Sequence, residues 1–222
     1  NLQNIPPGEP RGIFLPDNVI WTDWDFSQLE LRILAYLSGD KEMEYIFSLP
    51  KYNPDGTPNH ESDIHQQTAN FLGIPRKISK NVNFAMVYGG SDQILAETAN
   101  IRDPHRASQL REMWFAKFPQ AGDWIQQCQG EATAGNLRVK TLLGREIRLP
   151  DPFERGVNHT LSCSVNDRIQ SSAAEILKLA LKATKHLDLA LQIHDECLID
   201  GYVEEQWLKD TGKAPPPKVE AT

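Results

Sequence analysis

The sequence contains no apolar run long enough to span a bilayer and no charged-then-apolar leader at its start. We therefore expect a protein of the cell interior and no membrane partner. Cysteine is scarce: Cys128, Cys163 and Cys197 are far apart and form no C-x-x-C pair, which disfavours a disulfide framework and a zinc cluster. The G-x-S-x-G signature of a serine nucleophile is also missing.

Basic residues are outnumbered by acidic ones, 23 Lys and Arg against 30 Asp and Glu, which gives a formal net charge of −7 at pH 7. That balance argues weakly against a nucleic-acid binder, but the distribution of charge matters more than its sum. The stretch "RKISK" (76–80) is strongly basic, and further bases cluster between positions 138 and 155: Arg138, Lys140, Arg145, Arg148 and Arg155. A site for divalent cations would account for part of the negative excess.

Hydrophobic periodicity and the positions of Gly and Pro predict a mixed chain. The stretch 19–26 alternates and is predicted to be a strand, and the helix predicted at 27–40 ends at Gly39. Further helices are predicted at 63–73, 76–88, 91–100, 104–116, 119–134 and 160–186, with a loop at 48–62, two short strands around Leu143-Gly144 within 136–150, and a strand–turn–strand at 187–200. This order predicts an α+β fold with a helical insertion.

Asp25 stands at the C-terminal end of the predicted strand, where a carboxylate can be presented at a sheet edge. The simpler alternative is a helix cap, in which Asp25 or Ser27 precedes the helix and Glu30 closes a capping box. Asp23 lies on the same strand face, which leaves the assignment ambiguous.

The stretch "QIHDECLID" (192–200) places His194, Asp195 and Glu196 in the middle of an apolar run. A metal site and a proton-transfer site would both explain these residues. An ordinary turn would explain them too, because Asp is common in tight connections between strands. The residues alone leave these alternatives open.

The predicted helix at 76–88 carries Arg76, Lys80, Phe84 and Tyr88 in a slowly drifting stripe on one face. At about 1.5 Å per residue the stripe is roughly 18 Å long. Its cations lie toward the helix N-terminus, where the helix dipole also favours anions, and its aromatic residues lie further along. A nucleoside triphosphate has that layout. A solvated basic end that runs into a packed aromatic core would give the same pattern.

Together, two strand-end aspartates and a basic, aromatic helix are what two-metal phosphoryl transfer requires. Two Mg²⁺ ions about 4 Å apart activate an attacking 3′-hydroxyl and neutralise a leaving pyrophosphate. Mg²⁺ prefers one or two protein carboxylates plus phosphate oxygens. The departing pyrophosphate needs cations such as Arg76 and Lys80.

Three stretches resemble the motifs of the DNA polymerase I family (family A DNA polymerases), in the same order: "DFSQLELRILAYLSGD" (25–40) for motif A, "RKISKNVNFAMVYGG" (76–90) for motif B and "QIHDE" (192–196) for motif C. Supporting stretches are "NLQNIP" (1–6), "DIHQQTA" (63–69), "TLLGREIRLP" (141–150) and "NDRIQSSAAEILKLA" (166–180). The resemblance implies an antiparallel-sheet palm with an inserted helical fingers subdomain. Palm would occupy 1–38 and 136–222 and fingers 39–135, with the family's thumb and exonuclease regions absent.

The resemblance also implies DNA-directed DNA synthesis, in which deoxynucleotides pass from dNTPs to a primer 3′-hydroxyl and pyrophosphate is released. Asp25, Asp195 and the main-chain carbonyl of Phe26 would hold two Mg²⁺ ions, which Mn²⁺ could replace. Glu196 would support these ligands, and Lys80 would donate a proton to pyrophosphate.

A dNTP site is implied by the same motifs. Phe84 would pack against the sugar, and Phe rather than Tyr there implies poor acceptance of dideoxynucleotides. Glu30, bonded to Tyr88, would fill the space that a 2′-hydroxyl needs, and Tyr88 would also hold the template side. Four side chains would contact the triphosphate: Arg76, Lys80, His65 and Gln28.

Primer–template DNA is the implied partner. Asn166 and Gln170 would read its minor groove, Arg145 would lie near its backbone, and His194 would approach the primer terminus. A thumb or nuclease portion on the same gene or another chain is a further expected partner. The implied location is the cytoplasm or nucleoid, or an organelle or infected host cell.

Two alternatives remain beside this interpretation. A single-subunit RNA polymerase shares the two aspartates and a Lys-bearing helix, although Glu30 and Glu196 favour DNA synthesis. The other alternative is a non-catalytic fragment that only binds primer–template or a partner.

Overall fold

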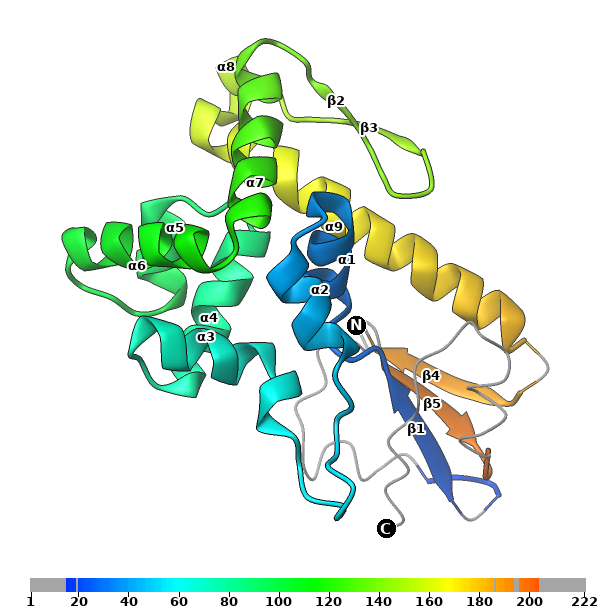
Figure 1. Cartoon of the computed structure of the whole chain (residues 1–222). Coiled ribbons are helices and arrows are strands. Elements are labelled where there is room, and N and C mark those ends of the chain that lie inside the picture. The colour runs from blue at the N-terminus through cyan, green and yellow to red at the C-terminus, as the bar shows by residue number, and fades with distance from the viewer. Residues whose placement is uncertain (1–14, 19, 186, 194–195, 204–222) are drawn as a thin grey trace. The chain divides into compact units, whose positions relative to one another are not determined.

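The computed structural model describes residues 15–18, 20–185, 187–193 and 196–203. These residues form helices and short antiparallel strands (Figure 1), which confirms the predicted α+β class. Within these ranges, no helix is both long and apolar enough to cross a membrane. His194 and Asp195, two of the predicted site residues, lie outside the described residues.

The chain divides into two compact units, one of residues 1–29 and 173–222, the other of residues 30–172. Helices α1 (Leu29–Ser38) and α9 (Val157–Ala183) each begin in one unit and end in the other. The division expected from the sequence places 30–38 and 136–172 with the sheet. In the division by compactness both segments lie in the unit of residues 30–172.

The first unit contains a three-stranded antiparallel sheet in the order β1–β5–β4 (Figure 1). Its strands are β1 (Trp21–Asp25), β4 (Leu189–Ile193) and β5 (Glu196–Asp200). Thr22 and Trp24 of β1 are buried and lie opposite the buried Ile199 and Cys197 of β5. This is the period-two alternation that the sequence predicts for a half-buried strand.

Side-chain bonds hold the far ends of β1 and β5 in register. The Asp200 carboxylate accepts from the backbone N–H groups of Asp17, at 2.9 Å, and Asn18, at 3.0 Å. The Thr22 hydroxyl donates to the carbonyl of Gly201, at 2.6 Å. Because a slip of one residue would turn every side chain to the other face, these bonds protect the buried face as well as the strand ends.

The second unit is mostly helical. The helices predicted from Gly, Pro and periodicity are all present, with ends shifted by a few residues, and so are the two short strands. Helices α2, η3 and α8 are additional, because segments this short carry too little periodicity to be read from sequence. Beside α1 and α9 the elements are α2 (Lys41–Ser48), the 3₁₀ helix η3 (His60–Ser62), α3 (Ile64–Leu72), α4 (Arg76–Val87), α5 (Asp92–Thr98), α6 (Pro104–Lys117), α7 (Pro119–Thr133), β2 (Arg138–Lys140), β3 (Glu146–Arg148) and α8 (Pro152–Arg155).

Asp40 joins two helices that are distant in sequence. It is fully buried, and its Oδ1 accepts from the backbone N–H of Met43 at the start of α2, at 3.0 Å. Its Oδ2 accepts from the N–H of Ala121 in the first turn of α7, at 3.1 Å. One carboxylate therefore satisfies two helix starts whose N–H groups would otherwise have no partner inside the protein.

The core of the helical unit surrounds Trp114 of α6. Its indole packs edge-on against Phe118, with 5.1 Å between ring centroids, and both side chains are fully buried. A second small cluster joins the β2–β3 hairpin to α7 through Val139, Leu149 and Ala132. This packing explains why the hairpin belongs to the helical unit.

Candidate active site

Asp25 and Glu196 lie directly opposite each other across β1 and β5. Asp25 is the last residue of β1 and Glu196 the first of β5, because antiparallel pairing brings the end of one strand beside the start of the other. The neighbouring pair, Trp24 and Cys197, is buried, so the two carboxylates share the opposite face of the sheet. Opposed residues have Cβ atoms about 4.5–5.5 Å apart, close enough for both carboxylates to reach one ligand.

These two carboxylates fit a hard divalent cation as a partial ligand set. Both are half-buried, and Mg²⁺ prefers one or two protein carboxylates in combination with other oxygens. Among the described residues, no three His, Cys, Asp or Glu side chains gather into a metal-binding group. A fuller set would need Asp195, which precedes Glu196 directly, and the carbonyl of Phe26, which follows Asp25.

The start of α1 lies close to the capping box proposed from the sequence. Helix α1 begins at Leu29, and Gln28 stands before it with a left-handed φ of 57°. Ser27 stands two residues before Leu29, and Glu30 lies in the first turn of the helix. The Oε1 atom of Gln28 is buried and has no hydrogen-bond partner within the described ranges.

Helix α4 presents the predicted stripe on its accessible side. Arg76 and Lys80 are exposed, and Phe84 and Tyr88 are half-buried. The two aromatic rings keep only part of their surface accessible, so the pattern fits both a nucleotide site and a solvated basic end that runs into a packed aromatic core. The opposite side of the helix is buried and consists of Ser79, Val82, Asn83, Ala85, Met86 and Val87.

Aromatic rings continue along this side. The centroid of the Phe84 ring lies 6.4 Å from that of Tyr88, with 28° between the ring planes, and 5.9 Å from that of His65. The ammonium group of Lys80 lies 5.9 Å from the Phe84 centroid, within the range of cation–π attraction. The accessible side of α4 thus passes from two cations to a chain of flat rings.

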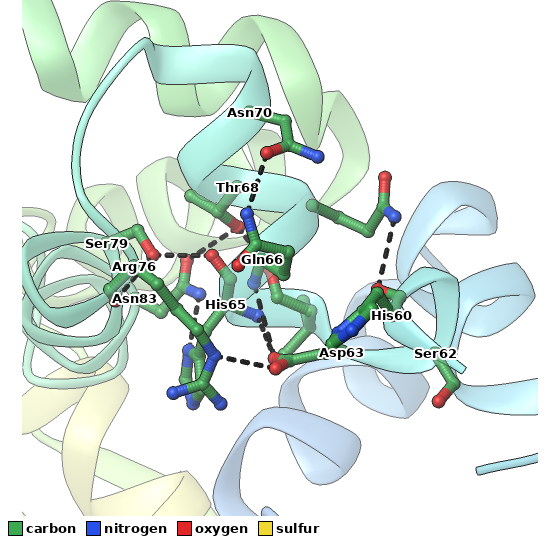
Figure 2. A network of polar contacts seen from close by, with 12 residues as sticks. His60, Ser62, Asp63, His65, Gln66, Thr68, Asn70, Arg76, Ser79 and Asn83 are labelled. Atoms are coloured by element: carbon green, nitrogen blue, oxygen red, sulfur yellow. Dashed lines mark hydrogen bonds and ion pairs between the residues drawn. The ribbon is translucent and has the colours of Figure 1, made fainter. Parts of the chain in front are cut away.

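A hydrogen-bond network ties α3 to α4 (Figure 2). The Oδ1 atom of Asp63 accepts from the N–H groups of His65 and Gln66, which caps α3, and its Oδ2 accepts from Nε of Arg76 at 2.7 Å. Burial raises the pKa of Asp63, but the hydrogen bonds and the Arg76 charge outweigh burial and lower that pKa overall. Asp63 therefore holds Arg76 beside the start of α3.

His65 lies at the centre of this network and is 3% exposed. Burial is the main cause that lowers the pKa of its imidazole to about 4; the charge of Asp63 opposes this shift, and the charges of Arg76 and Lys80 add to it. The ring is therefore neutral at physiological pH. Its Nδ1 lies 2.9 Å from the side-chain nitrogen of Asn83 on α4.

Glu30 and Tyr88 come close together within the helical unit. Burial raises the pKa of the Tyr88 hydroxyl, and the nearby charge of Glu30 raises it further, because a second negative charge beside a carboxylate is unfavourable. The structure thus brings the first turn of α1 to the C-terminal end of α4.

Three predicted DNA contacts also lie in the helical unit. Asn166 and Gln170 are four residues apart on α9 and so share one face of that helix. Asn166 is half-buried, whereas Gln170 is exposed. Arg145 is exposed and directly precedes β3.

Three residues of the site region escape prediction from sequence. Asp63 could be found by its place at the start of a predicted helix, where Asp is a favoured cap. Asn83 and Trp114 carry no such signal, because their importance arises from contacts between α3, α4 and α6.

The sequence matches the family described as DNA polymerase family A over residues 1–211. The chain belongs to DNA polymerase family A. Among its relatives are DNA polymerase I of Lactococcus lactis subsp. lactis (strain IL1403), 33% identical over 92% of this chain, and the thermostable DNA polymerase I of Thermus aquaticus, 30% identical over 90%. The chain spans about a quarter of the length of these relatives, 25% in each case.

The fold of this family A chain is also similar to a solved structure, the POL domain of Pol1 from M. smegmatis in complex with DNA primer-template and dNTP. The TM-score is 0.73 at 26% sequence identity, over 98% of this chain and 42% of the other. The similarity covers both compact units, which supports the mixed helix and antiparallel-sheet architecture.

Proposed function

We propose that this chain carries the nucleotidyl-transfer site of a DNA-directed DNA polymerase, which adds deoxynucleotides from dNTPs to a primer 3′-hydroxyl and releases pyrophosphate. The observation that carries the proposal is the accessible side of α4, where two exposed cations lead into half-buried aromatic rings. That side matches the length and polarity of a triphosphate joined to a nucleoside. Membership of family A favours a DNA product over the RNA product of a single-subunit RNA polymerase.

Asp25, Asp195 and the Phe26 carbonyl would hold the metal ions, with Glu196 beside them. The donor set is all oxygen, which suits Mg²⁺ and also permits Mn²⁺. When bound, such ions supply activation of the attacking hydroxyl and neutralisation of phosphate charge. The protein's own contribution is to keep Asp25 and Glu196 on one face of the sheet.

The triphosphate would lie along the N-terminal half of α4. Arg76, oriented by Asp63, and Lys80 would bind its oxygens, and Lys80 would give a proton to the pyrophosphate as it leaves. Gln28 and His65 would complete the contacts. Cations at fixed positions stabilise the charge that develops on a leaving pyrophosphate.

The sugar would lie against Phe84. Glu30, close to Tyr88, would occupy the space that a 2′-hydroxyl needs and so select deoxynucleotides. Tyr88 would also support the template base. Both are half-buried, as expected of groups that line a site rather than fill a core.

Primer–template DNA would contact Asn166 and Gln170 on α9, Arg145 before β3, and His194. In this assignment residues 1–38 and 136–222 are palm and residues 39–135 are fingers. A thumb or nuclease portion, on the same gene or another chain, would add to the DNA grip. The site of action would be inside the cell, where the DNA is.

The decisive experiment is primer extension with Mg²⁺ and all dNTPs. Asp25→Asn and Asp195→Ala are expected to lower extension by about 10³-fold or more, because each removes a charged group that stabilises the transition state. Asp23→Asn is the matched control: it removes a charge from the same strand face, and extension is expected to persist. Extension that survives Asp195→Ala would remove Asp195 from the mechanism.

The second candidate function is a module that binds primer–template without catalysis. This second function is favoured if the unmutated chain binds primer–template but does not extend it. The same result must hold for the full-length product of its gene. Efficient use of NTPs in place of dNTPs would overturn the role of Glu30.

A further inference from the structure

The imidazole of His65 is held by a directed chain of hydrogen bonds. Its Nδ1 lies 2.9 Å from Nδ2 of Asn83, and the Asn83 side chain is itself fully buried. Oδ1 of Asn83 lies 2.8 Å from Nε1 of Trp114 and 3.2 Å from the Thr68 hydroxyl. All residues in this series of hydrogen bonds lie in the helical unit.

Trp114 determines which way the hydrogen bonds of this series run. An indole N–H can only donate a hydrogen bond, so the Asn83 atom that faces it must be the amide oxygen. The other end of the amide is then the NH₂ group, which donates to Nδ1 of His65. An Nδ1 that accepts carries no proton, and a neutral imidazole must therefore carry its proton on Nε2.

Charges around the ring reinforce this state. Arg76 and Lys80 on α4 oppose protonation of His65, and Asp63 at the start of α3 favours it. Burial is the largest effect and acts with the two cations, so the pKa of His65 falls to about 4. Within the described residues, hydrogen bonding to the ring involves Nδ1 alone. The Nε2–H group therefore remains for a ligand.

We propose that Asn83, anchored by Trp114, is a positioning residue that holds His65 as a neutral ring and aims its Nε2–H at an anionic oxygen. The ligand part of this inference rests on the proposed function, in which the anion is the triphosphate of a dNTP. A ring of the opposite tautomer would face the same oxygen with a lone pair and would repel it. Arg76 and Lys80 supply charge, whereas His65 supplies one directed hydrogen bond.

The tautomer can be measured directly by ¹⁵N–¹H correlation NMR of the histidine rings, with His65 assigned by its loss in His65→Gln. Nδ1 is expected to give the signal of an unprotonated nitrogen and Nε2 that of a protonated one, from pH 8 down to about 5. A His65 ring that carries its proton on Nδ1, or that exchanges equally between both forms, would overturn the proposal. This readout requires no substrate.

Asn83→Asp reverses the bond to His65. A carboxylate accepts from both Trp114 and Nδ1–H, so the variant is expected to move the neutral proton to Nδ1 and to raise the pKa of the ring. The KM for dNTP should then rise about tenfold at pH 8, where the ring is neutral, and recover toward pH 6, where Nε2 is protonated again. kcat should change less than KM, because the bond contributes to binding.

Two further variants make the result specific. His65→Gln keeps an N–H donor with no titration, so the double variant with Asn83→Asp should lose the pH dependence of KM. Asn70→Asp adds the same charge at an exposed position of α3 and should leave the tautomer and KM unchanged. If Asn83→Asp does not fold, Trp114→Phe removes the anchoring N–H instead and should mix the two tautomers.

The outcomes separate this inference from the proposed function. One outcome is that His65 of the unmutated protein carries its proton on Nε2 but the KM of Asn83→Asp does not depend on pH. That outcome would overturn the role of Asn83 in substrate binding. A correct tautomer in a chain that neither binds dNTP nor extends a primer would overturn the proposed function instead. That outcome would also remove the triphosphate as the ligand of Nε2–H.

Discussion

Oδ2 of Asp63 lies 2.7 Å from Nε of Arg76, while Oδ1 of the same carboxylate caps α3. One side chain therefore starts a helix and orients the first cation of the next helix. The bond uses Nε, and the Arg76 side chain is 49% exposed, so the pair lies at the surface of the helical unit. The connection between α3 and α4 is short enough for this arrangement because Gly73 adopts a left-handed φ of 65°.

Replacing Asp63 separates its two roles. Asp63→Asn keeps a good helix cap and removes the charge, whereas Asp63→Ala removes both. We expect Asp63→Ala to lower the free energy of unfolding by about 1–2 kcal/mol and Asp63→Asn by less than about 1 kcal/mol, because half-exposed ion pairs contribute little. Urea unfolding measures both values, and equal losses would show that the ion pair, not the cap, dominates.

His65 makes stability depend on pH. Its pKa is about 4 in the folded chain, against about 6.5 for an unperturbed imidazole. Between these values the unfolded chain binds a proton that the folded chain does not, so stability falls as pH falls through this window. The loss approaches about 1.4 kcal/mol per pH unit.

His65→Gln should flatten this slope between pH 6.5 and 4, measured by urea unfolding at a series of pH values. The matched control is His60→Gln, because His60 is exposed at the start of η3. An unchanged slope in His65→Gln would show that other groups cause the acid sensitivity. The carboxylate of Asp63 also has a lowered pKa, but its contribution is lost below about 4, outside this window.

Gly89 tests the close contact between the end of α4 and α9. Its φ is 101°, and a Cβ added there would lie 2.6 Å from Cα of Ser162. Gly89→Ala is therefore expected to lower the free energy of unfolding by about 2–4 kcal/mol, because backbone strain and overpacking add. Gly130→Ala, on an exposed and uncrowded site of α7, should instead stabilise the chain by about 0.5–1 kcal/mol. Similar effects at both sites would contradict the contact.

Glu30 tests selection of the sugar. Glu30→Ala removes the side chain proposed to occupy the space of a 2′-hydroxyl, and it removes a charge that raises the pKa of Tyr88. Incorporation of NTPs relative to dNTPs should rise at least about tenfold. The reason is that the smaller alanine side chain no longer excludes the 2′-hydroxyl of an NTP. Primer extension with each nucleotide class measures the ratio.

A second readout follows the same substitution. The pKa of Tyr88 should fall toward its ordinary value in Glu30→Ala, which ultraviolet titration of the phenol can detect. Glu44→Ala, at an exposed position of α2, is the control for both measurements. A lower Tyr88 pKa without a change in sugar selection would separate the electrostatic contact from the proposed gate.

Local sequence signals predicted most elements of the fold. Pro104 and Pro119 stand at the first positions of α6 and α7, and Gly73 ends α3, as helix-end chemistry requires. Alternation predicted β1, and the structure shows that Thr22 and Trp24 form its buried face. The short helices α2 and α8 were missed, because one or two turns show no reliable period.

The stripe on α4 was determined by sequence alone, because residues four apart share a helix face whatever surrounds the helix. Tertiary structure decided what the stripe faces and what orients it. The Asp63–Arg76 bond, the direction of the Asn83 amide and the pairing of Asp25 with Glu196 each join distant parts of the chain. Such contacts depend on which elements meet in space, and the periodicity within one helix or strand does not specify its neighbour.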